Sequence, residues 1–170
     1  ETTVHIEFAR ELNDANKRKA IADRNREYQK LREEARTAIT KLYEEETGHS
    51  IKEITEDDIL KYILWKEQNH ICLYTGQQIK ITDFVGANPK FDIEHTLPRS
   101  VGGDSTRMNL TLCDSRYNRE VKKAQLPSQL PDYDDILCRI EPWKKKYEDL
   151  DKRMRWLRTN GAATKEDKDR

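Results

Sequence analysis

Residues that cross-link, break or anchor a chain are scarce in this sequence. Its 170 residues include three cysteines, six glycines and five prolines, and no two cysteines stand in CxxC spacing. A zinc site built on paired cysteines is therefore not predicted, and we expect no structural zinc. An odd number of cysteines without a secretion signal is typical of a reducing cytosol. No apolar run approaches the roughly 20 residues of a membrane span, so we expect a cytoplasmic protein without a membrane partner.

An excess of charge of either sign is also missing. The 32 basic residues balance the 32 acidic ones, although charged residues make up 38% of the chain. A uniformly basic nucleic-acid-binding protein is thereby excluded, and any basic surface has to be local. Hydrophobic residues, at 35%, suffice for one modest core, and the many charges favour long exposed helices.

The beginning of the chain has neither an initiating methionine nor the features of a signal peptide. It reads ETTVHIEF, and the first methionine is Met108. We therefore expect a fragment, or a processed product, of a longer protein.

Apolar periodicity predicts that much of the chain is helical. Between Tyr28 and Leu42, apolar residues recur at three- and four-residue spacing, which is one face of a helix, and Gly48 can end it. Residues 9–30 carry a thinner apolar stripe and are interpreted as a helix that needs a partner or as a partly ordered linker. Residues 4–8, VHIEF, are predicted to form a short β-like run.

Further helices are indicated by their capping residues. Thr55 and Asp58 have the spacing of a capping box, which predicts a helix ending near Gln68. Two more helices are expected near residues 132–140 and 142–158, after a loop at 126–131. The polar tail at 162–170 is predicted to be disordered.

In the middle of the chain, apolar residues no longer recur every three or four residues but alternate with polar ones. Residues 78–84, Phe91–His95 and Leu110–Cys113 are predicted to be short strands. Asp114 can cap a short helix that runs through Asn118 to Lys123. A strand, a loop, a strand and a helix of these lengths can fold so that the helix lies across the hairpin.

This arrangement can bring three chemically useful side chains to one point. Glu94 and His95 end the first strand, and Asn118 lies one turn inside the helix. A carboxylate and an amide oxygen suit Mg²⁺, and a neutral imidazole can take a proton from water at pH 7. Together they meet the needs of phosphodiester hydrolysis. Asp92 shares the strand face of Glu94 and is a second candidate ligand.

The same stretch resembles the HNH, or ββα-metal, nuclease motif. The resemblance implies that His95 is the general base, that Glu94 and Asn118 bind one divalent metal ion, and that Asn109 holds the loop and orients the histidine. It also implies an α+β, mostly helical fold with a ββα-metal core, a small antiparallel β-hairpin and surrounding helices. The expected ion is Mg²⁺, for which Mn²⁺ substitutes. The residues that carry the resemblance are Glu94, His95, Pro98, Ser100, Gly102, Gly103, Asn109 and Asn118.

Two departures from the family pattern matter for the site. Zinc-containing members have paired cysteines around this core, whereas Cys72 and Cys113 each stand alone in the sequence. RNA-guided members more often have aspartate before the histidine, where this chain has Glu94. The assignment of the main metal carboxylate therefore stays open between Glu94 and Asp92.

The flanks resemble a particular branch of this family. Residues 4–13, VHIEFARELN, are similar to the second RuvC-like segment of type II CRISPR effectors, which are prokaryotic RNA-guided DNA endonucleases. Glu7 matches a RuvC metal carboxylate, but its partner ligands are absent from this chain. The resemblance implies a RuvC segment and helical linker at 1–50, an HNH core at 51–142, and a C-terminal helix with a second linker at 143–170.

By this resemblance, the domain cleaves the target DNA strand that is paired to a guide RNA, in antiviral defence. The implied partners are that heteroduplex, the other domains of the parent protein and a phage anti-CRISPR inhibitor. Residues 96–123 hold six basic residues against three acidic ones, which predicts a locally basic rim around the pocket. The rim residues are Arg99, Arg116, Arg119, Lys122 and Lys123.

Two alternative functions remain. One is a stand-alone HNH nuclease of the homing or restriction type, against which the VHIEFAREL segment and the missing initiating methionine both argue. The other is a helical interaction module without catalytic activity, which predicts no divalent-metal binding at the Glu94–His95 motif.

Overall fold

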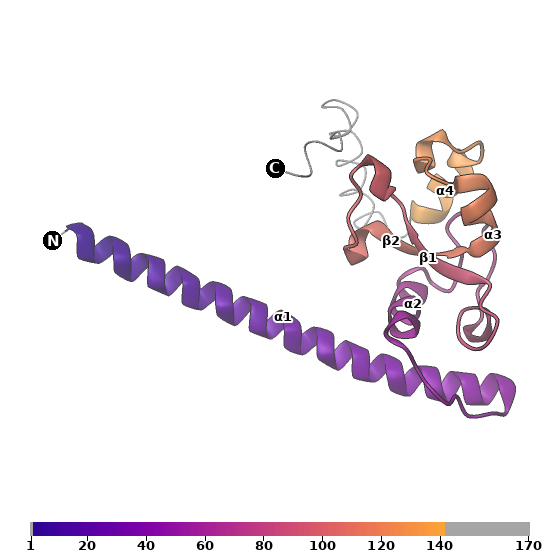
Figure 1. Ribbon diagram of the computed structural model, residues 1–170, viewed down its shortest axis with the longest axis horizontal. Helices are drawn as coiled ribbons and strands as arrows, with labels where there is room; N and C mark the ends of the chain where they lie inside the picture. Colours follow the sequence, from indigo (N-terminus) through magenta and orange to yellow (C-terminus); the bar gives the residue numbers. More distant parts are fainter. Residues whose placement is uncertain (1, 142–170) are drawn as a thin grey trace.

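The computed structural model describes the backbone of residues 2–141 and the side chains of residues 14–141. Its first element is the single long helix α1 (Thr2–Thr47), whose N-terminal part projects away from the rest of the molecule (Figure 1). The remaining elements form a small α+β unit. They are α2 (Glu56–Glu67), β1 (Phe91–His95), β2 (Leu110–Asp114), α3 (Ser115–Tyr117) with a following π-helical turn (Asn118–Lys122), and α4 (Tyr133–Ile140).

The strand predicted at residues 4–8 is wrong, because these residues belong to α1. No strand among the described residues pairs with them, and a helix satisfies its own backbone hydrogen bonds without a partner. Residues 9–30 are also helical, which settles the choice between helix and partly ordered linker. Ion pairs one turn apart, such as Lys30–Glu34 and Lys41–Glu45, support the exposed helix by a few tenths of a kcal/mol each.

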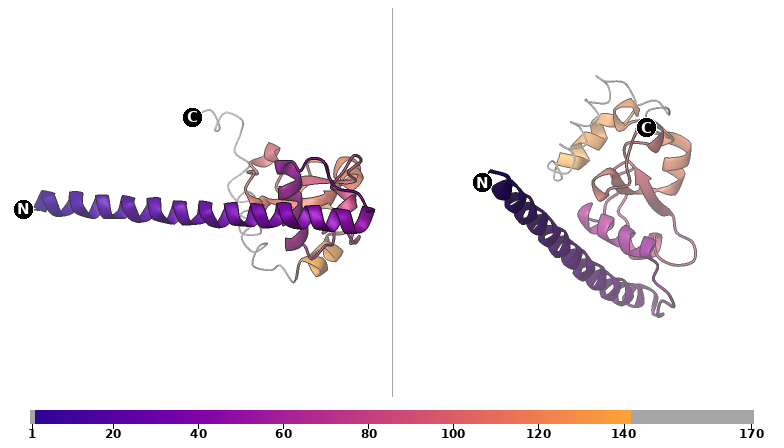
Figure 2. Two further views of the ribbon diagram at one scale, coloured as in Figure 1. Left: turned by 90° about the horizontal axis from the view of Figure 1, so that it is seen from below. Right: turned by 60° about the vertical axis from the view of Figure 1, so that its left-hand side comes forward.

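Only the C-terminal part of α1 packs against the α+β unit, and the two views of Figure 2 agree on this. Ala35 and Ile39 are fully buried there, as the apolar stripe predicted. Glu56 at the start of α2 binds both Arg32 and Arg36 of α1, the latter at 2.8 Å. Buried apolar side chains, with these ion pairs at their edge, therefore hold α1 and α2 together.

The predicted signals at the ends of the first two helices are confirmed. Gly48 follows α1 with a φ of +72°, a conformation that favours glycine. Thr55 and Asp58 form the capping box, in which each side chain binds the backbone N–H of the other residue. The helix α2 then ends at Glu67, with Gln68 as its C-cap.

The sheet consists of β1 and β2, which pair antiparallel with Glu94 opposite Thr111 and His95 opposite Leu110. It lies between α2 on one side and the helical turns after β2 on the other (Figures 1 and 2). The third predicted strand, at residues 78–84, is wrong. Only the isolated bridge between Ile71 and Gln78 forms, and residues 81–83 are a 3-10 turn that Asp83 caps by accepting from the Lys80 N–H.

The core gathers around the sheet and the turn that precedes it. Each fully buried aliphatic or aromatic side chain contributes on the order of 1.5–3 kcal/mol to folding. Gln68 completes the sheet edge, because its side chain accepts from the Leu112 N–H at 2.6 Å and donates to the Leu112 carbonyl at 3.0 Å. The largest core members are Ile39, Ile59, Leu64, Leu73, Tyr74, Ile79, Phe84, Leu97, Leu112 and Ile136.

The helix after β2 begins where it was predicted. Asp114 caps it by accepting a hydrogen bond from the Tyr117 N–H at 2.8 Å, and the chain widens into the π-helical turn before Lys123. The predicted loop at 126–131 contains a 3-10 turn at residues 127–129, and α4 matches the helix expected near 132–140. The helix and tail predicted beyond residue 141 lie outside the described residues. Within residues 2–141, no helix combines the length and apolarity needed to cross a bilayer.

Candidate active site

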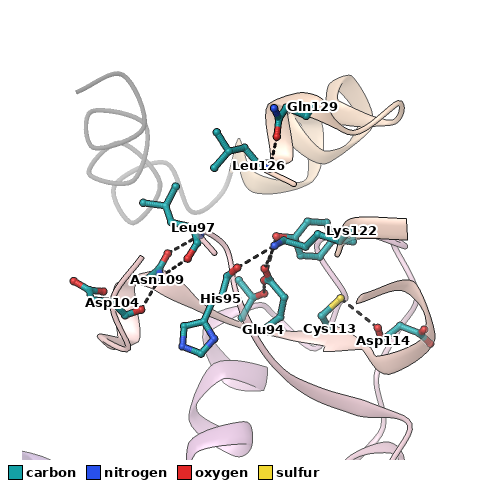
Figure 3. A network of polar contacts seen from close by, with 12 residues as sticks. Glu94, His95, Leu97, Asp104, Asn109, Cys113, Asp114, Lys122, Leu126 and Gln129 are labelled. Carbon is teal, nitrogen blue, oxygen red and sulfur yellow. Dashed lines mark hydrogen bonds and ion pairs between the residues drawn. The ribbon is translucent and has the colours of Figure 1, made fainter. Parts of the chain in front are cut away.

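A pocket of about 300 Å³ opens where the end of β1 meets the π-helical turn. Glu94, His95 and Asn118 all line it, so the structure brings together the three side chains that the sequence predicted to meet. Pairing of β1 with β2 places Glu94 beneath the helix that follows β2. Figure 3 shows the His95 ring directed away from the Glu94 carboxylate, as expected for neighbours on a strand. The other lining residues are Ile93, Pro98, Arg99, Lys122, Lys123 and Ala124.

The Glu94 carboxylate is buried, with 1% of the residue exposed, and its two oxygens have different surroundings. Oε2 accepts hydrogen bonds from the Thr111 hydroxyl at 2.6 Å and the Tyr74 hydroxyl at 3.1 Å. Oε1 lies 2.6 Å from the Lys122 ammonium, which is equally buried and donates to the His95 carbonyl at 3.0 Å (Figure 3). Two hydroxyls therefore fix the carboxylate, and one ammonium balances its charge.

Oε1 of Glu94 meets one requirement of a metal site. It is buried and takes no part in the hydrogen bonds that hold Oε2, so that within the described part of the chain its partner is the Lys122 ammonium alone. Asn118 adds an amide to the same pocket, so the donor set fits a hard divalent cation. The described residues contain no cluster of three or more acidic, histidine or cysteine side chains suited to a metal. An ion with few protein ligands and several waters is the binding mode typical of Mg²⁺.

His95 is half-buried and held by two polar side chains of the hairpin loop. Its Nε2 lies 3.1 Å from the Ser105 hydroxyl and accepts from Arg99 Nε at 3.3 Å, while Arg99 also donates to Ser105 at 2.8 Å. Burial, followed by the nearby Arg99 charge, lowers the pKa of His95, although Glu94 acts in the opposite direction. A lowered pKa favours the neutral imidazole, and because arginine can only donate, the contact with Arg99 favours the tautomer with its lone pair on Nε2.

Asn109 is completely buried and does not line the pocket. Its side chain accepts from the Leu97 N–H at 2.8 Å and donates to the Leu97 carbonyl at 3.0 Å and the Asp104 carbonyl at 2.7 Å (Figure 3). Of the roles predicted for Asn109, the structure supports that of loop anchor. Gly103 closes the same loop so tightly that a Cβ atom there would lie 1.8 Å from the Leu97 carbonyl oxygen.

Asp92, the other candidate ligand, is placed away from the pocket lining. Its carboxylate accepts from the Ser115 hydroxyl at 2.6 Å and pairs with Lys61 at 3.3 Å. Partial burial alone would raise the pKa of Asp92, but the contacts with Ser115 and Lys61 outweigh it and lower the pKa. The geometry therefore favours Glu94 over Asp92 as the metal carboxylate.

The predicted basic rim is only partly present. Arg99 and Lys123 are exposed beside the pocket, but Arg116 pairs with Glu120, and Arg119 donates to the Ser115 carbonyl. The placement of Lys122 on the rim is wrong. Its ammonium is buried against Glu94, because the π-helical turn directs it inward onto that carboxylate.

Several residues of the site escaped the sequence analysis. Tyr74 and Thr111 hold Glu94, and the only indication of them in the sequence is the register of the two strands, which places Thr111 opposite Glu94. Cys72 and Cys113 stand alone in the sequence, yet the fold brings their thiols together. The hydrogen bond between them is the main cause that lowers the pKa of Cys72 to about 6, and it raises the pKa of Cys113. Contacts between distant segments of this kind have no local sequence pattern.

Comparison with known proteins decides the family. The family model described as HNH endonuclease matches residues 72–128, which include the hairpin and the helix after it. These residues form an HNH endonuclease domain. The HNH nuclease predicted from the motif is confirmed, as is the mostly helical α+β fold class. HNH nucleases generally depend on a divalent metal ion.

Two curated relatives place this HNH domain among Cas9 endonucleases. The chain is 31% identical to CRISPR-associated endonuclease Cas9 1 of Streptococcus thermophilus over 129 residues, which is 75% of this chain and 11% of that protein. It is 37% identical to CRISPR-associated endonuclease Cas9 of Campylobacter jejuni over 67 residues, which is 39% of this chain and 7% of that protein. The chain therefore spans only a small part of these relatives.

Solved structures agree on the fold. The crystal structure of Streptococcus thermophilus Cas9 in complex with the AGAA PAM superimposes with a TM-score of 0.59 at 23% identity, over 78% of this chain and 14% of that one. The structure of the same organism's Cas9 with the AGGA PAM gives a TM-score of 0.54 at 26% identity, over 69% of this chain and 11% of that one. Most of this chain thus has the fold of a part of Cas9.

Proposed function

We propose that this chain is the HNH nuclease domain of an RNA-guided DNA endonuclease, and that it hydrolyses the target strand paired to a guide RNA. The observation that carries the proposal is the pocket in which Glu94, His95 and Asn118 meet. The similarity to Cas9 proteins supports the guide RNA and the other domains of a parent protein as partners. A prokaryotic cytoplasm and a role in antiviral defence follow from the same similarity.

The metal proposed for this site is Mg²⁺, with Mn²⁺ as a substitute. Glu94 Oε1 and the side-chain oxygen of Asn118 would hold it. When bound, the ion offsets the charge that develops on the phosphate and on the leaving oxygen. Tyr74 and Thr111 keep the Glu94 carboxylate oriented, so that little rearrangement is needed at Oε2.

His95 is proposed to take the proton of the attacking water at Nε2, the nitrogen that carries its lone pair. In the absence of DNA, Arg99 and Ser105 engage this nitrogen. A DNA phosphate offers Arg99 a stronger, charged acceptor than a neutral imidazole. Substrate binding would therefore draw Arg99 away and free Nε2 for the water, and the Asn109 anchor would keep the loop in place.

The test is strand-specific cleavage by the parent enzyme with guide RNA, Mg²⁺ and separately labelled strands. We expect His95→Ala to abolish cutting of the target strand while the other strand is still cut. His49→Ala is the matched control, because His49 is exposed and distant in sequence from the hairpin. Continued cutting of the target strand by His95→Ala at the wild-type rate would refute the proposed base.

The isolated chain is expected to cleave DNA only weakly. Its net charge is zero, and only Arg99 and Lys123 of the predicted rim are exposed beside the pocket. Phosphate contacts supply most of the affinity for nucleic acid, so other domains would have to position the strand. Tight, salt-resistant cutting by the 170-residue chain alone would contradict this. The pocket opens to the surface beside Arg99 and Lys123, and we propose it as the binding surface of an anti-CRISPR inhibitor.

A further inference from the structure

Lys122 occupies an unusual place for a lysine. Its ammonium is buried with 1% of the residue exposed, 2.6 Å from Glu94 Oε1 and 3.0 Å from the His95 carbonyl. A buried ammonium is unfavourable unless it is paired, and here the pairing partner is Oε1, the carboxylate oxygen that the two hydroxyls leave free. Lys122 therefore places a positive charge at the atom best suited to bind a metal ion.

The local backbone explains how the lysine reaches this atom. Asn118 and Lys122 begin and end one π-helical turn, closed by a hydrogen bond from the Lys123 N–H to the Asn118 carbonyl at 2.9 Å. Residues four apart in such a turn lie on nearly the same face. Asn118 and Lys122 consequently both line the pocket beside Glu94, and π-helical turns of this kind are frequent at functional sites.

We propose that the Lys122 ammonium takes the place of the divalent ion at Glu94 in the metal-free protein, and that it withdraws into the pocket when the ion binds. The inference rests on the proposed function, because it takes Glu94 as the metal carboxylate. An ammonium and a divalent cation repel each other strongly at one oxygen in a buried site. The flexible lysine stem and the adjoining pocket of about 300 Å³ give the ammonium a path outward.

The surroundings also indicate what receives the displaced ammonium. Among the described residues that line the pocket, Glu94 is the only acid, whereas Arg99 and Lys123 are basic. Lys122 therefore has no second carboxylate to move to within this lining, and a phosphate of the bound strand would be its partner. Metal binding should accordingly be weak without nucleic acid, since the ion has to displace a buried charge.

The direct test is calorimetric titration of the 170-residue chain with Mn²⁺ in the absence of nucleic acid. We expect Lys122→Met to bind Mn²⁺ at least tenfold more tightly than wild type, because the competing charge is gone. Lys52→Met is the matched control and should bind as wild type does, since Lys52 is exposed and does not line the pocket. An affinity of Lys122→Met equal to or weaker than wild type would overturn the inference.

Glu94→Gln separates this inference from the proposed function. If Mn²⁺ binding is lost in Glu94→Gln but unchanged in Lys122→Met, the metal site stands and the role of Lys122 is wrong. If neither wild type nor Lys122→Met binds Mn²⁺ through Glu94, the metal site itself is wrong, and the inference fails with it.

A second measurement uses the wild-type chain and does not depend on the folding of a variant. Mass spectrometry after brief amine acetylation compares Lys122 with its exposed neighbour Lys123. Without metal, Lys122 should react at least tenfold more slowly than Lys123, and saturating Mn²⁺ should raise the rate at Lys122 alone. Equal protection of Lys122 with and without bound metal would show that the ammonium does not withdraw.

Discussion

Replacing Asn109 by alanine tests whether the hairpin loop depends on one buried amide. The change removes three hydrogen bonds, two with Leu97 and one with Asp104, at a residue that is 0% exposed. Each contributes about 1 kcal/mol net, and a buried backbone N–H left without a partner costs about 1–3 kcal/mol more. We therefore expect the free energy of unfolding to fall by about 4–6 kcal/mol, a large share of a typical domain's stability.

The assay is urea unfolding of the 170-residue chain followed by intrinsic fluorescence. Asn25→Ala on the exposed part of α1 is the matched control and should change the free energy of unfolding by less than about 0.5 kcal/mol. Asn109→Asp keeps the acceptor for the Leu97 N–H but sets a charged carboxylate against two carbonyl oxygens. It should also be destabilised. An alanine variant within about 0.5 kcal/mol of wild type would refute the reasoning.

Three further predictions follow from single contacts. Gly103→Ala should prevent the loop from closing and abolish cleavage, because the added Cβ would meet the Leu97 carbonyl oxygen at 1.8 Å. Gln68→Ala should lower the free energy of unfolding by about 2–4 kcal/mol in urea titrations, since Leu112 loses both of its side-chain partners. His70 has a pKa lowered by burial and then by a nearby lysine, so NMR titration should give a value below 6.5. The contribution of neutral His70 to the free energy of unfolding is therefore complete above pH 6.5 and is lost as the pH falls through the pKa of the folded state.

Each of these predictions has a control or a contrary outcome. Gly48→Ala has open space around the added carbon and should lose only about 1 kcal/mol, from its positive φ. Gln77→Ala, at an exposed position, should leave the unfolding midpoint in urea unchanged. A pKa of His70 at or above 6.5, or equal stabilities for Gln68→Ala and Gln77→Ala, would contradict the structural explanation.

Elements with a local physical cause could be predicted from the sequence. The Thr55 capping box, the end of α1 at Gly48 and the Asp114 cap depend on residues within one turn of each other. The strands β1 and β2 follow from alternation, and the HNH motif then places Glu94 and His95 on the hairpin. The capping signals were sufficient because the interactions that stabilise them join neighbouring residues, and the two strands were found because each has a partner within about 20 residues.

The two strands that were predicted wrongly depend instead on contacts between distant segments. The alternation at residues 78–84 is that of a strand, but whether a strand forms depends on a partner, and only one bridge is available there. The apolar run at residues 4–8 likewise has no partner strand among the described residues and continues α1 instead. Strand pairing joins segments that are distant in sequence, so the pattern of one segment alone does not decide it.

Sequence alone determined which residue types are available to the site, namely a carboxylate, an imidazole and an amide at HNH spacing. It left the choice between Asp92 and Glu94 open, because both lie on one face of β1. Tertiary packing separates the two, because Glu94 lines the pocket whereas Asp92 lies outside that lining, bound to Ser115 and Lys61. The same packing buried Lys122, which the sequence presented as one more surface charge. Burial and pairing of charges depend on which distant elements meet, and only the folded chain specifies that.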